Sequence, residues 1–449
     1  MEFQRDIYKP LIEWTKTKKG LLLKGTRQVG KTFILNKLAK EKFKNSLYIN
    51  LGNVDTCAWF ENTEMRLVNG ADWLNAFTAY AEKERQQFSD DGDTIVILDE
   101  IQSSGRVFNG LRQMVRECNF KVVGTGSYLG IMDIENYYSV NKQSYFYPAG
   151  DVTVMEMYPM TYSEVIAACK ENGVEDLIAI GNYYVKFGGF PEVVENWINY
   201  REPNPCIETL NNIFMVLVAE SQRYFHGAFP EEVWVDTLIS VIKQIESKKA
   251  IPESQELVYK FRESDGLNVT RQETVDSMRW MLACNLLFLG DVVNNLKHPE
   301  KRVKYSYYIA DQGLMYIILD RSQRKTFSII DNGNIPGLMA ENFVALNIQE
   351  FMRPVTYEKS NPSEEIDFIA LKDGELTAIE VKFTSGEVKS SESALLGGDI
   401  KHIIKVQGRL EEPQTDAATV ILLHDCHRLG ELLGESPSKT KYDKPPILF

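Results

Sequence analysis

Eight consecutive residues near the start of the chain have the types and spacing of a phosphate-binding loop. They fit the pattern GxxxxGK[ST] at every fixed position and are Gly25, Thr26, Arg27, Gln28, Val29, Gly30, Lys31 and Thr32. Glycines let backbone N–H groups turn toward phosphate oxygens, and the helix that such a loop opens adds a field favourable to anions. The pattern predicts that Lys31 reaches the β- and γ-phosphates of a nucleotide and that the Thr32 hydroxyl ligates Mg²⁺. A chance match in a glycine-containing turn is the alternative.

An apolar run that ends in two acids, residues 94–100, predicts the second part of this site. We expect this strand to lie beside the strand that enters the phosphate loop. Asp99 would then hold Mg²⁺, and Glu100 would polarise the attacking water as general base. A buried strand that meets solvent at two charges would show the same pattern. After the next apolar run, Ser127, with Thr125 behind it, is the candidate for sensing the γ-phosphate; a tight turn that needs small residues is an equal alternative.

Four charged residues in the last third of the chain could form a second site: Glu341 on an expected helix, Asp367 on an expected strand, and Glu380 and Lys382 on the next strand. Residues two apart face the same side of a strand, so Glu380 and Lys382 share a face that Asp367 can join. This Asp…Glu-x-Lys arrangement resembles the PD-(D/E)xK nucleases. As an isolated tripeptide, however, Glu-Val-Lys is also ordinary solubilising sequence of an edge strand.

The nuclease resemblance implies hydrolysis of phosphodiesters with the help of a metal ion. Asp367, Glu380 and the Val381 carbonyl would be the oxygen ligands of Mg²⁺. Lys382 would position or activate water and stabilise the developing negative charge, and Glu341 would act through a metal-bound water. A fold can host such residues without retaining cleavage, so binding without cleavage stays open.

Short apolar runs alternate with helical segments through about the first 160 residues. We expect buried strands near residues 21–23, 47–49, 95–98 and 122–123, with helices over 32–42 and 71–88. Strands that alternate with helices imply a parallel sheet with right-handed crossovers. The phosphate loop would follow the first strand and open the first helix, which is the context that the motif requires.

The middle of the chain is expected to be helical, with a tight turn at Gly188-Gly189. Beyond it, strands over 290–296 and 303–309 form a hairpin with a basic tip, and helices followed by such a hairpin resemble a winged-helix unit. The basic residues of the hairpin would contact DNA phosphates, or the unit only connects its neighbours. These residues are Lys297, Lys301, Arg302 and Lys304.

A linker over residues 331–337 is expected to open a new α/β unit. It is followed by a helix and four strands, which we expect over 338–351, 365–371, 376–383, 400–406 and 418–423. The run of polar residues at 424–427 contains two histidines and a cysteine, but it lacks the spaced pairs of a structural zinc site. We interpret it as the polar end of a strand, and residues 437–449 as a loose tail.

The composition of the 449 residues, 44 % hydrophobic and 25 % charged, is that of a soluble globular protein with about three domains by length. No stretch approaches the ~18 apolar residues of a membrane helix, and the first residues lack the apolar segment of a signal peptide. Six scattered cysteines without a CxxC pair favour free thiols in a reducing compartment. We therefore expect a cytoplasmic protein with no membrane partner. The net charge of −13 argues against indiscriminate binding to nucleic acid, although a local basic groove remains compatible with it.

The phosphate loop, the run from Leu98 to Gln102 and the Gly-Ser turn at 126–127 together resemble an AAA+-type ATPase. Further short motifs follow in order along nearly the whole chain, at residues 158–164, 188–193, 309–314, 340–344 and 365–368. With them the chain resembles a prokaryotic family in which this ATPase is fused to a C-terminal domain of unknown function. The resemblance implies ATP and Mg²⁺ as ligands, and ATP hydrolysis as an activity.

One position departs from that family. Such ATPases often carry a basic residue after a glycine where this chain has Gly150-Asp151. The acidic residue leaves the arginine that neutralises phosphate charge unassigned. The candidates are Arg106, Arg112, Arg116 and Arg223, each of which could equally be a solvated surface charge.

The sequence thus predicts an α/β multidomain protein. We expect a P-loop ATPase core with a parallel sheet over residues 1–160, a helical lid over 161–232, a helical and winged-helix-like domain over 233–330, and a PD-(D/E)xK nuclease-like domain over 331–449. One hypothesis is an ATP-driven enzyme whose C-terminal domain acts on DNA. The other is a nucleotide-dependent switch or scaffold that binds DNA, a protein partner or a second copy of itself without cleavage. Convergence of the four C-terminal residues would favour the first.

Overall fold

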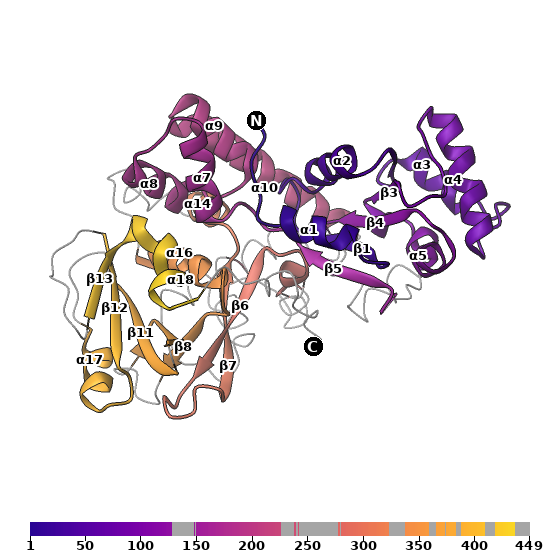
Figure 1. Cartoon of the computed structure of the whole chain (residues 1–449). Coiled ribbons are helices and arrows are strands. Elements are labelled where there is room, and N and C mark those ends of the chain that lie inside the picture. The colour runs from indigo at the N-terminus through magenta and orange to yellow at the C-terminus, as the bar shows by residue number, and fades with distance from the viewer. Residues whose placement is uncertain are drawn as a thin grey trace. The chain divides into compact units, whose positions relative to one another are not determined.

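The computed structural model describes residues 1–127, 150–225, 280–322, 337–358, 365–372, 374–382, 388–408 and 418–435, with single positions 148, 238, 241, 277 and 278 between them. The chain divides into two compact units (Figure 1). The first, called here the N-terminal unit, consists of Gln4–Tyr158 and a short piece at Ala283–Asn285. The second, called the C-terminal unit, comprises Met1–Phe3, Pro159–Leu282 and Leu286–Lys441.

The N-terminal unit is built on a five-stranded parallel sheet in the order β2-β3-β4-β1-β5. The strands are β1 (Gly20–Lys24), β2 (Asn45–Asn50), β3 (Thr94–Asp99), β4 (Lys121–Gly126) and β5 (Val152–Glu156). The first four confirm the predicted strands, whereas β5 was not predicted. The expectation that β3 lies next to β1 is wrong, because β4 pairs with both and separates them. The carboxyl ends of β1 and β3 nevertheless open at the same edge of the sheet.

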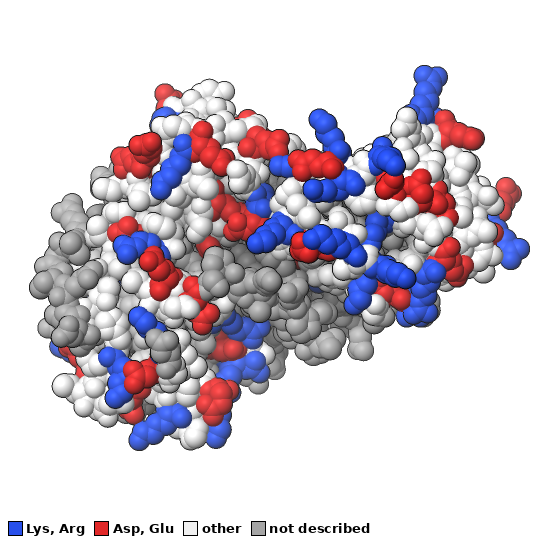
Figure 2. Space-filling model, viewed as in Figure 1, with Lys and Arg blue, Asp and Glu red and all other residues white. Residues whose placement is uncertain are grey.

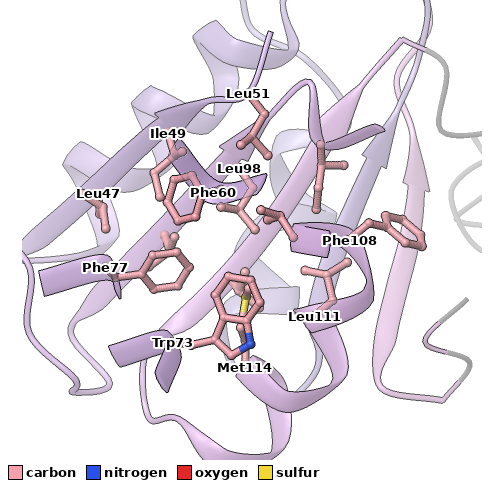
Figure 3. Close-up of a cluster of buried hydrophobic side chains, with 14 of the residues drawn as sticks. Leu47, Ile49, Leu51, Phe60, Trp73, Phe77, Leu98, Phe108, Leu111 and Met114 are labelled. Atoms are coloured by element: carbon pink, nitrogen blue, oxygen red, sulfur yellow. The ribbon is translucent and has the colours of Figure 1, made fainter. Parts of the chain in front are cut away.

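Helices cover this sheet, and its strands β1 and β3 are buried on both faces. Every residue of β1 and β3 is buried, which explains their continuous apolar sequence. The helices are α1 (Tyr8–Thr15), α2 (Lys31–Lys42), α3 (Val54–Glu61), α4 (Gly70–Glu84) and α5 (Gly105–Glu117), with the 3₁₀ turn η1 at Ile101–Ser103. Figure 3 shows the core on one face, where strand residues such as Leu47 and Leu98 meet Phe60, Trp73 and Phe77 from the helices.

The C-terminal unit begins with four helices. They are α7 (Tyr162–Glu171), α8 (Leu177–Phe187), α9 (Pro191–Tyr200) and α10 (Pro203–Phe225). Thr161 and Glu164 form a capping box that starts α7. The predicted turn at Gly188-Gly189 joins α8 to α9, and it needs glycine: a Cβ on Gly189 would lie 1.9 Å from the Met160 carbonyl oxygen. Most of the first part of the domain expected over 233–330 lies outside the described residues, apart from single positions before residue 280.

A four-stranded sheet follows, in the order β7-β6-β8-β9. Its strands are β6 (Leu287–Val293), β7 (Arg302–Ile309), β8 (Val355–Glu358) and β9 (Glu365–Ile366), and α14 (Gln312–Ser322) follows β7. The predicted hairpin is therefore present as β6 and β7. β6 also pairs in parallel with β8, so the hairpin is built into one sheet with strands from beyond residue 350 and does not stand as a separate wing.

A second four-stranded sheet, in the order β10-β11-β12-β13, contains the remaining predicted strands. These are β10 (Phe368–Lys372), β11 (Glu375–Lys382), β12 (His402–Gln407) and β13 (Ala418–Leu422). The accompanying helices are α16 (Gly337–Gln349), α17 (Lys389–Leu396), the 3₁₀ helix η3 (Leu423–Arg428) and α18 (Leu429–Leu432). Asp367 lies between β9 and β10, at the point where the chain leaves one sheet and enters the other.

None of the helices in the described residues is long and apolar enough to cross a membrane. All six cysteines are free thiols, as the sequence predicts.

Candidate functional site

The phosphate loop connects β1 to α2, as the motif requires, and its backbone depends on glycine at two positions. Gly25 has φ +153° and Gly30 has φ +94°, and a Cβ on Gly25 would lie 2.1 Å from the Met157 carbonyl oxygen. Gln28 also has a positive φ of 61°. Because φ in this region turns successive N–H groups toward one point, the loop forms a concave cradle for an anion at the start of α2.

Lys31 is buried and folded into its own loop. Its Nζ donates hydrogen bonds to the carbonyl oxygens of Gly25 and Thr26, each at 2.8 Å. Burial lowers the pKa of Lys31 to about 8, while the nearby charges of Glu100 and Asp99 act to raise it. An anion in the loop would favour the charged ammonium, so the lysine is placed to pair with a phosphate.

Thr32 and Asp99 meet at the carboxyl edge of the sheet, although their strands are not neighbours. The Thr32 hydroxyl donates to the Asp99 carboxylate at 2.8 Å, and the Tyr48 hydroxyl donates to the same oxygen at 2.7 Å. Mg²⁺ takes few protein ligands when substrate phosphates and waters supply the rest, so one hydroxyl and one carboxylate suit it. The residues present therefore fit a Mg²⁺–nucleotide complex.

The sequence did not single out Tyr48, the third member of this group. Burial, followed by the hydrogen bond to Asp99, raises the pKa of the Tyr48 hydroxyl and keeps it a donor. Its position near the end of β2, in parallel register with Ile97 of β3, is the signal that could have found it. Predicting that contact would have required knowing that β2 pairs with β3.

Glu100 follows directly after β3 in a left-handed conformation, with φ 52°. Its two carboxylate oxygens have different partners. Arg27 Nη2 of the phosphate loop lies 3.4 Å from Oε1, and the Gln102 side-chain amide donates to Oε2. A non-glycine residue adopts this backbone conformation only at a cost, which the two side-chain contacts help to offset.

The end of β4 lies between the ends of β1 and β3. Thr125 uses its hydroxyl inside the sheet, where it donates to the Leu23 carbonyl oxygen at 3.0 Å. Gly126 gives room to Gln102, because a Cβ there would lie 1.9 Å from the Gln102 side-chain oxygen. Ser127 is buried at the carboxyl end of the strand. Of the two candidate sensors, Ser127 is the one beyond the strand end.

Three of the four candidate arginines bind other groups of the chain, away from the phosphate loop. Arg106 donates to the carbonyl oxygens of Phe60, Asn62 and Met65. Arg112 and Arg116 pair with Asp151, with Nε–carboxylate distances of 3.1 and 2.8 Å. The side chain of the fourth, Arg223, lies outside the described part of the molecule.

The acidic residue at position 151 also has a structural explanation. Arg116, and then Arg112, lower the pKa of the Asp151 carboxylate. The Asp151 carbonyl oxygen accepts the N–H of Gly20, the first residue of β1, so Asp151 lies at the amino edge of the sheet. The phosphate loop follows the last residue of β1, at the opposite edge. Asp151 therefore ties α5 to the sheet and takes no part in the phosphate site.

The region around the phosphate loop matches a known protein family. Residues 17–166 match the family model described as an AAA domain. This region of the chain is an AAA-type P-loop ATPase domain. The match includes the phosphate loop and the acidic strand end, and it stops short of the second half of the chain.

Comparisons with whole proteins add little to this assignment. No curated protein matches the chain. A Walker-type ATPase of Pyrococcus abyssi is 14 % identical with TM-score 0.46, over 71 % of this chain and 96 % of the other. A STAND-class signal transduction ATPase with a tetratricopeptide repeat sensor, from Pyrococcus horikoshii, is 12 % identical with TM-score 0.28, over 78 % and 48 %. A RuvB mutant of Thermotoga maritima is 12 % identical with TM-score 0.28, over 64 % and 90 %. These likenesses are too weak to extend the assignment beyond the AAA domain.

In the C-terminal unit, three of the four predicted residues converge. Lys382 Nζ lies 2.8 Å from Glu380 Oε2 and 3.2 Å from Asp367 Oδ2. Asp367 also accepts the N–H of Val381 at 2.8 Å, and the Ser391 hydroxyl donates to Glu380. Burial, and then the charge of Asp367, raise the pKa of Glu380, against which Lys382 acts. Two buried carboxylates this close favour a cation between them.

Glu341 lies on α16, which packs against β11, the strand that carries Glu380 and Lys382. Glu341 and Asp367 share a neighbour, the Tyr308 hydroxyl. Burial raises the pKa of the buried Tyr308 hydroxyl, and the charges of Glu341 and Asp367 act in the same direction, so both carboxylates lie near this hydroxyl. Among the described residues, no three acidic, histidine or cysteine side chains are arranged to hold a metal ion. Asp367 and Glu380 are the side-chain ligands that the sequence predicts for a metal at this position.

Two further polar residues belong to the same face, and the sequence did not single them out. Lys405 and Gln407 of β12 are 4 % and 3 % exposed. They stand in parallel register with Glu380 and Lys382, so all four side chains lie on one face of the sheet. The signal in the sequence that could have identified them is a lysine and a glutamine within the apolar run of the strand.

The polar run at 424–427 and two of the basic hairpin residues make contacts within the chain. Tyr162 donates to the His424 carbonyl oxygen, within the polar run that the sequence marked as a strand end and that forms η3. In the hairpin, Lys304 pairs with Glu358 and Arg302 lies 3.7 Å from Asp291. Over the face shown in Figure 2, acidic and basic side chains alternate over the described surface.

Proposed function

We propose that the chain binds ATP with Mg²⁺ and hydrolyses it. The observation that carries this proposal is the meeting of Thr32 and Asp99 at 2.8 Å beside a phosphate loop that contains Lys31. Lys31 would pair with the β- and γ-phosphates, and the backbone N–H groups from Gly25 to Thr32 would bind the phosphate chain. When bound, Mg²⁺ would supply positive charge that neutralises the phosphates. Thr32 and Asp99 would hold it.

Glu100 is the proposed general base. It lies one residue beyond Asp99 and is held by the Gln102 amide. From there the carboxylate would polarise a water for attack on the terminal phosphate. Ser127, at the end of the neighbouring strand, is proposed to contact that phosphate.

Two variants test these roles. Lys31→Ala is expected to lose ATP affinity in calorimetry with Mg²⁺, because one buried cation no longer pairs with the phosphates. Glu100→Gln is expected to keep ATP binding and to lower turnover by roughly 10²-fold or more, the usual contribution of a general base. Equal turnover by Glu100→Gln and wild type would refute the base assignment. If the wild type binds no nucleotide, the ATPase proposal itself fails.

We propose as a second function that the C-terminal unit acts on DNA through Asp367, Glu380 and Lys382. The position of both carboxylates within 3.2 Å of the Lys382 Nζ supports it. Asp367 and Glu380, with the Val381 carbonyl, would hold Mg²⁺, which would polarise a phosphodiester and its attacking water. Lys382 would stabilise the charge that develops on the phosphate, and Glu341 would act from the side of Tyr308.

Cleavage is tested on DNA with Mg²⁺, comparing wild type with Lys382→Ala. Lys401→Ala is a matched control, since Lys401 is exposed at the start of β12 in the same unit. Cleavage lost only in Lys382→Ala supports the nuclease. Absence of any lysine-dependent cleavage leaves the alternative, in which ATP state controls binding of DNA, a protein or a second copy without cutting.

A further inference from the structure

The ATPase site contains an ion pair that the phosphate-loop motif does not require. Arg27 Nη2 lies 3.4 Å from Glu100 Oε1. Arg27 occupies one of the variable positions of the motif, between the two glycines, so the pattern alone gives its side chain no role. The side chains of Arg27 and Glu100 are 31 % and 17 % exposed, so the pair is largely shielded from solvent.

The position of the guanidinium is defined from two sides. It reaches Glu100, the residue placed to polarise the attacking water. It also lies close enough to Lys31 to act on its charge, because Arg27 contributes to lowering the pKa of Lys31. Lys31 faces the β- and γ-phosphates in this motif. A cation that neighbours both groups therefore lies at the end of the loop where the terminal phosphate and the water meet.

The charges of the site also suggest an exchange of partners. Two acids, Asp99 and Glu100, face two bases, Lys31 and Arg27, so the described site balances itself without ligand. A triphosphate with Mg²⁺ brings both signs of charge. Asp99 would hold the metal ion, and the phosphate oxygens would attract both cations. Arg27 would then turn from Glu100 to the terminal phosphate, which leaves the Glu100 carboxylate available to a water.

We propose that Arg27 is the catalytic arginine of this ATPase, supplied by the same chain: it masks Glu100 without nucleotide and pairs with the terminal phosphate of bound ATP. This role rests on the ATP hydrolysis proposed above. A guanidinium suits it because its planar fork can contact two phosphate oxygens at once.

The other arginines of the described N-terminal unit are less well placed. Arg112 and Arg116 pair with Asp151 at the opposite edge of the sheet. Arg106 is held by three carbonyl oxygens. Arg5 donates to the carbonyl oxygens of Val29 and Tyr158, which supports the loop from behind.

The first test separates phosphate contact from structural support. Calorimetry with Mg²⁺ measures the affinity of Arg27→Ala for ADP and for a non-hydrolysable ATP analogue. Loss of a charge-assisted hydrogen bond to the terminal phosphate is expected to weaken analogue binding roughly tenfold or more. ADP binding is expected to change less than about twofold, because ADP lacks that phosphate. Arg66→Ala is the matched control, since Arg66 is 73 % exposed in the same unit and pairs with Asp72.

The second test uses turnover. Removing an arginine that stabilises the transition state costs on the order of 10³-fold in kcat. Arg27→Ala is expected to fall by that factor, and Arg27→Lys is expected to recover part of analogue binding and little of kcat, because it keeps the charge without the fork. Turnover per chain is expected to stay constant on dilution, because the arginine comes from the same chain.

The outcomes discriminate between the proposals. Unchanged preference for the ATP analogue over ADP in Arg27→Ala, with wild-type melting temperature, overturns the phosphate contact. Turnover per chain that falls on dilution overturns its supply in cis. If the wild type binds neither nucleotide, the ATPase proposal itself fails. If the wild type binds nucleotide but Arg27→Ala has wild-type affinities and turnover, only the role of Arg27 is refuted.

Discussion

Asp311 provides a prediction about the stability of the C-terminal unit. This carboxylate is 2 % exposed and joins the turn between α8 and α9 to the start of α14. It accepts the N–H of Gly189 at 2.8 Å and that of Leu314 at 3.0 Å. The close approach requires glycine at position 188, because a Cβ there would lie 2.4 Å from both carboxylate oxygens. One acid thus holds two segments far apart in the sequence.

Burial raises the pKa of Asp311 to about 6 from its ordinary value of 3.8, and the backbone N–H groups only partly oppose this. Between these two values, the folded protein keeps the proton and the unfolded chain loses it. The contribution to the free energy of unfolding is therefore fully present below about pH 4 and is lost as pH rises through 6. At ~1.4 kcal/mol per pKa unit, the difference of 2.2 units (6 minus 3.8) amounts to about 3 kcal/mol.

The measurement compares wild type with Asp311→Asn from pH 4 to pH 7. Asparagine has no proton to lose, so the free energy of unfolding of the variant is expected to improve relative to wild type by about 3 kcal/mol over this range. At low pH the variant is expected to be the less stable protein. In the variant, the asparagine NH₂ faces a backbone N–H and cannot accept its hydrogen bond, as the carboxyl oxygen does in wild type. The lost hydrogen bond costs roughly 1–3 kcal/mol.

The assay must report on this unit alone, because a multidomain chain does not unfold in one step. A denaturant series at each pH, followed by a brief hydrogen-exchange pulse at one fixed pH, achieves this when peptides covering residues 180–200 are analysed by mass spectrometry. Asp176→Asn serves as control, since Asp176 is an exposed cap of α8. The reasoning would be refuted if the difference in the free energy of unfolding between wild type and Asp311→Asn did not change with pH. It would also be refuted if wild type became the more stable of the two by a growing margin as pH rises.

Two glycines of the AAA domain give further predictions. Gly126→Ala is expected to displace Gln102, because the new Cβ would lie 1.9 Å from the Gln102 side-chain oxygen, and so to misplace Glu100. We expect kcat to fall roughly 10- to 100-fold while calorimetry shows unchanged ATP affinity. A loss of ATP affinity together with the fall in kcat would contradict this prediction. Gly110→Ala would place a Cβ 2.1 Å from the ring of buried Trp73, and the overpacking is expected to cost about 1–3 kcal/mol, seen as a lower Tm in calorimetry; an unchanged Tm would show that the ring can move.

The sequence predicted those parts of the fold that local patterns determine. Four strands of the parallel sheet were recognisable because each contains a short apolar run, and the loop because its glycines match a phosphate-binding pattern. The fifth strand, β5, was missed because it lies at the sheet edge and only two of its five residues are buried, so it has no continuous apolar run. Its assignment depends on pairing with β1, which is a non-local property.

The same distinction holds at the two sites. Glu380 and Lys382 were placed on one face by the period of a strand, and Asp367 by an expected neighbouring strand. The positions of Tyr48 beside Asp99 and of Tyr308 beside Asp367 depend on which strands pair, and no local pattern encodes that. The insertion of β4 between β1 and β3 is another such case: the predicted residues meet, but not through adjacent strands.

Both sites also share an electrostatic principle that sets how each would take up a ligand. In each, a basic side chain neutralises the acids that would serve catalysis: Arg27 pairs with Glu100, and Lys382 pairs with Asp367 and Glu380. A metal ion entering either site alone would meet that cation and gain less from the acids. A phosphate that arrives with the metal offers the cation another partner, so metal and phosphate should bind cooperatively. Wild-type affinity of the C-terminal unit for Mg²⁺ should therefore rise when DNA is present, and this dependence should vanish in Lys382→Ala even if no strand is cut.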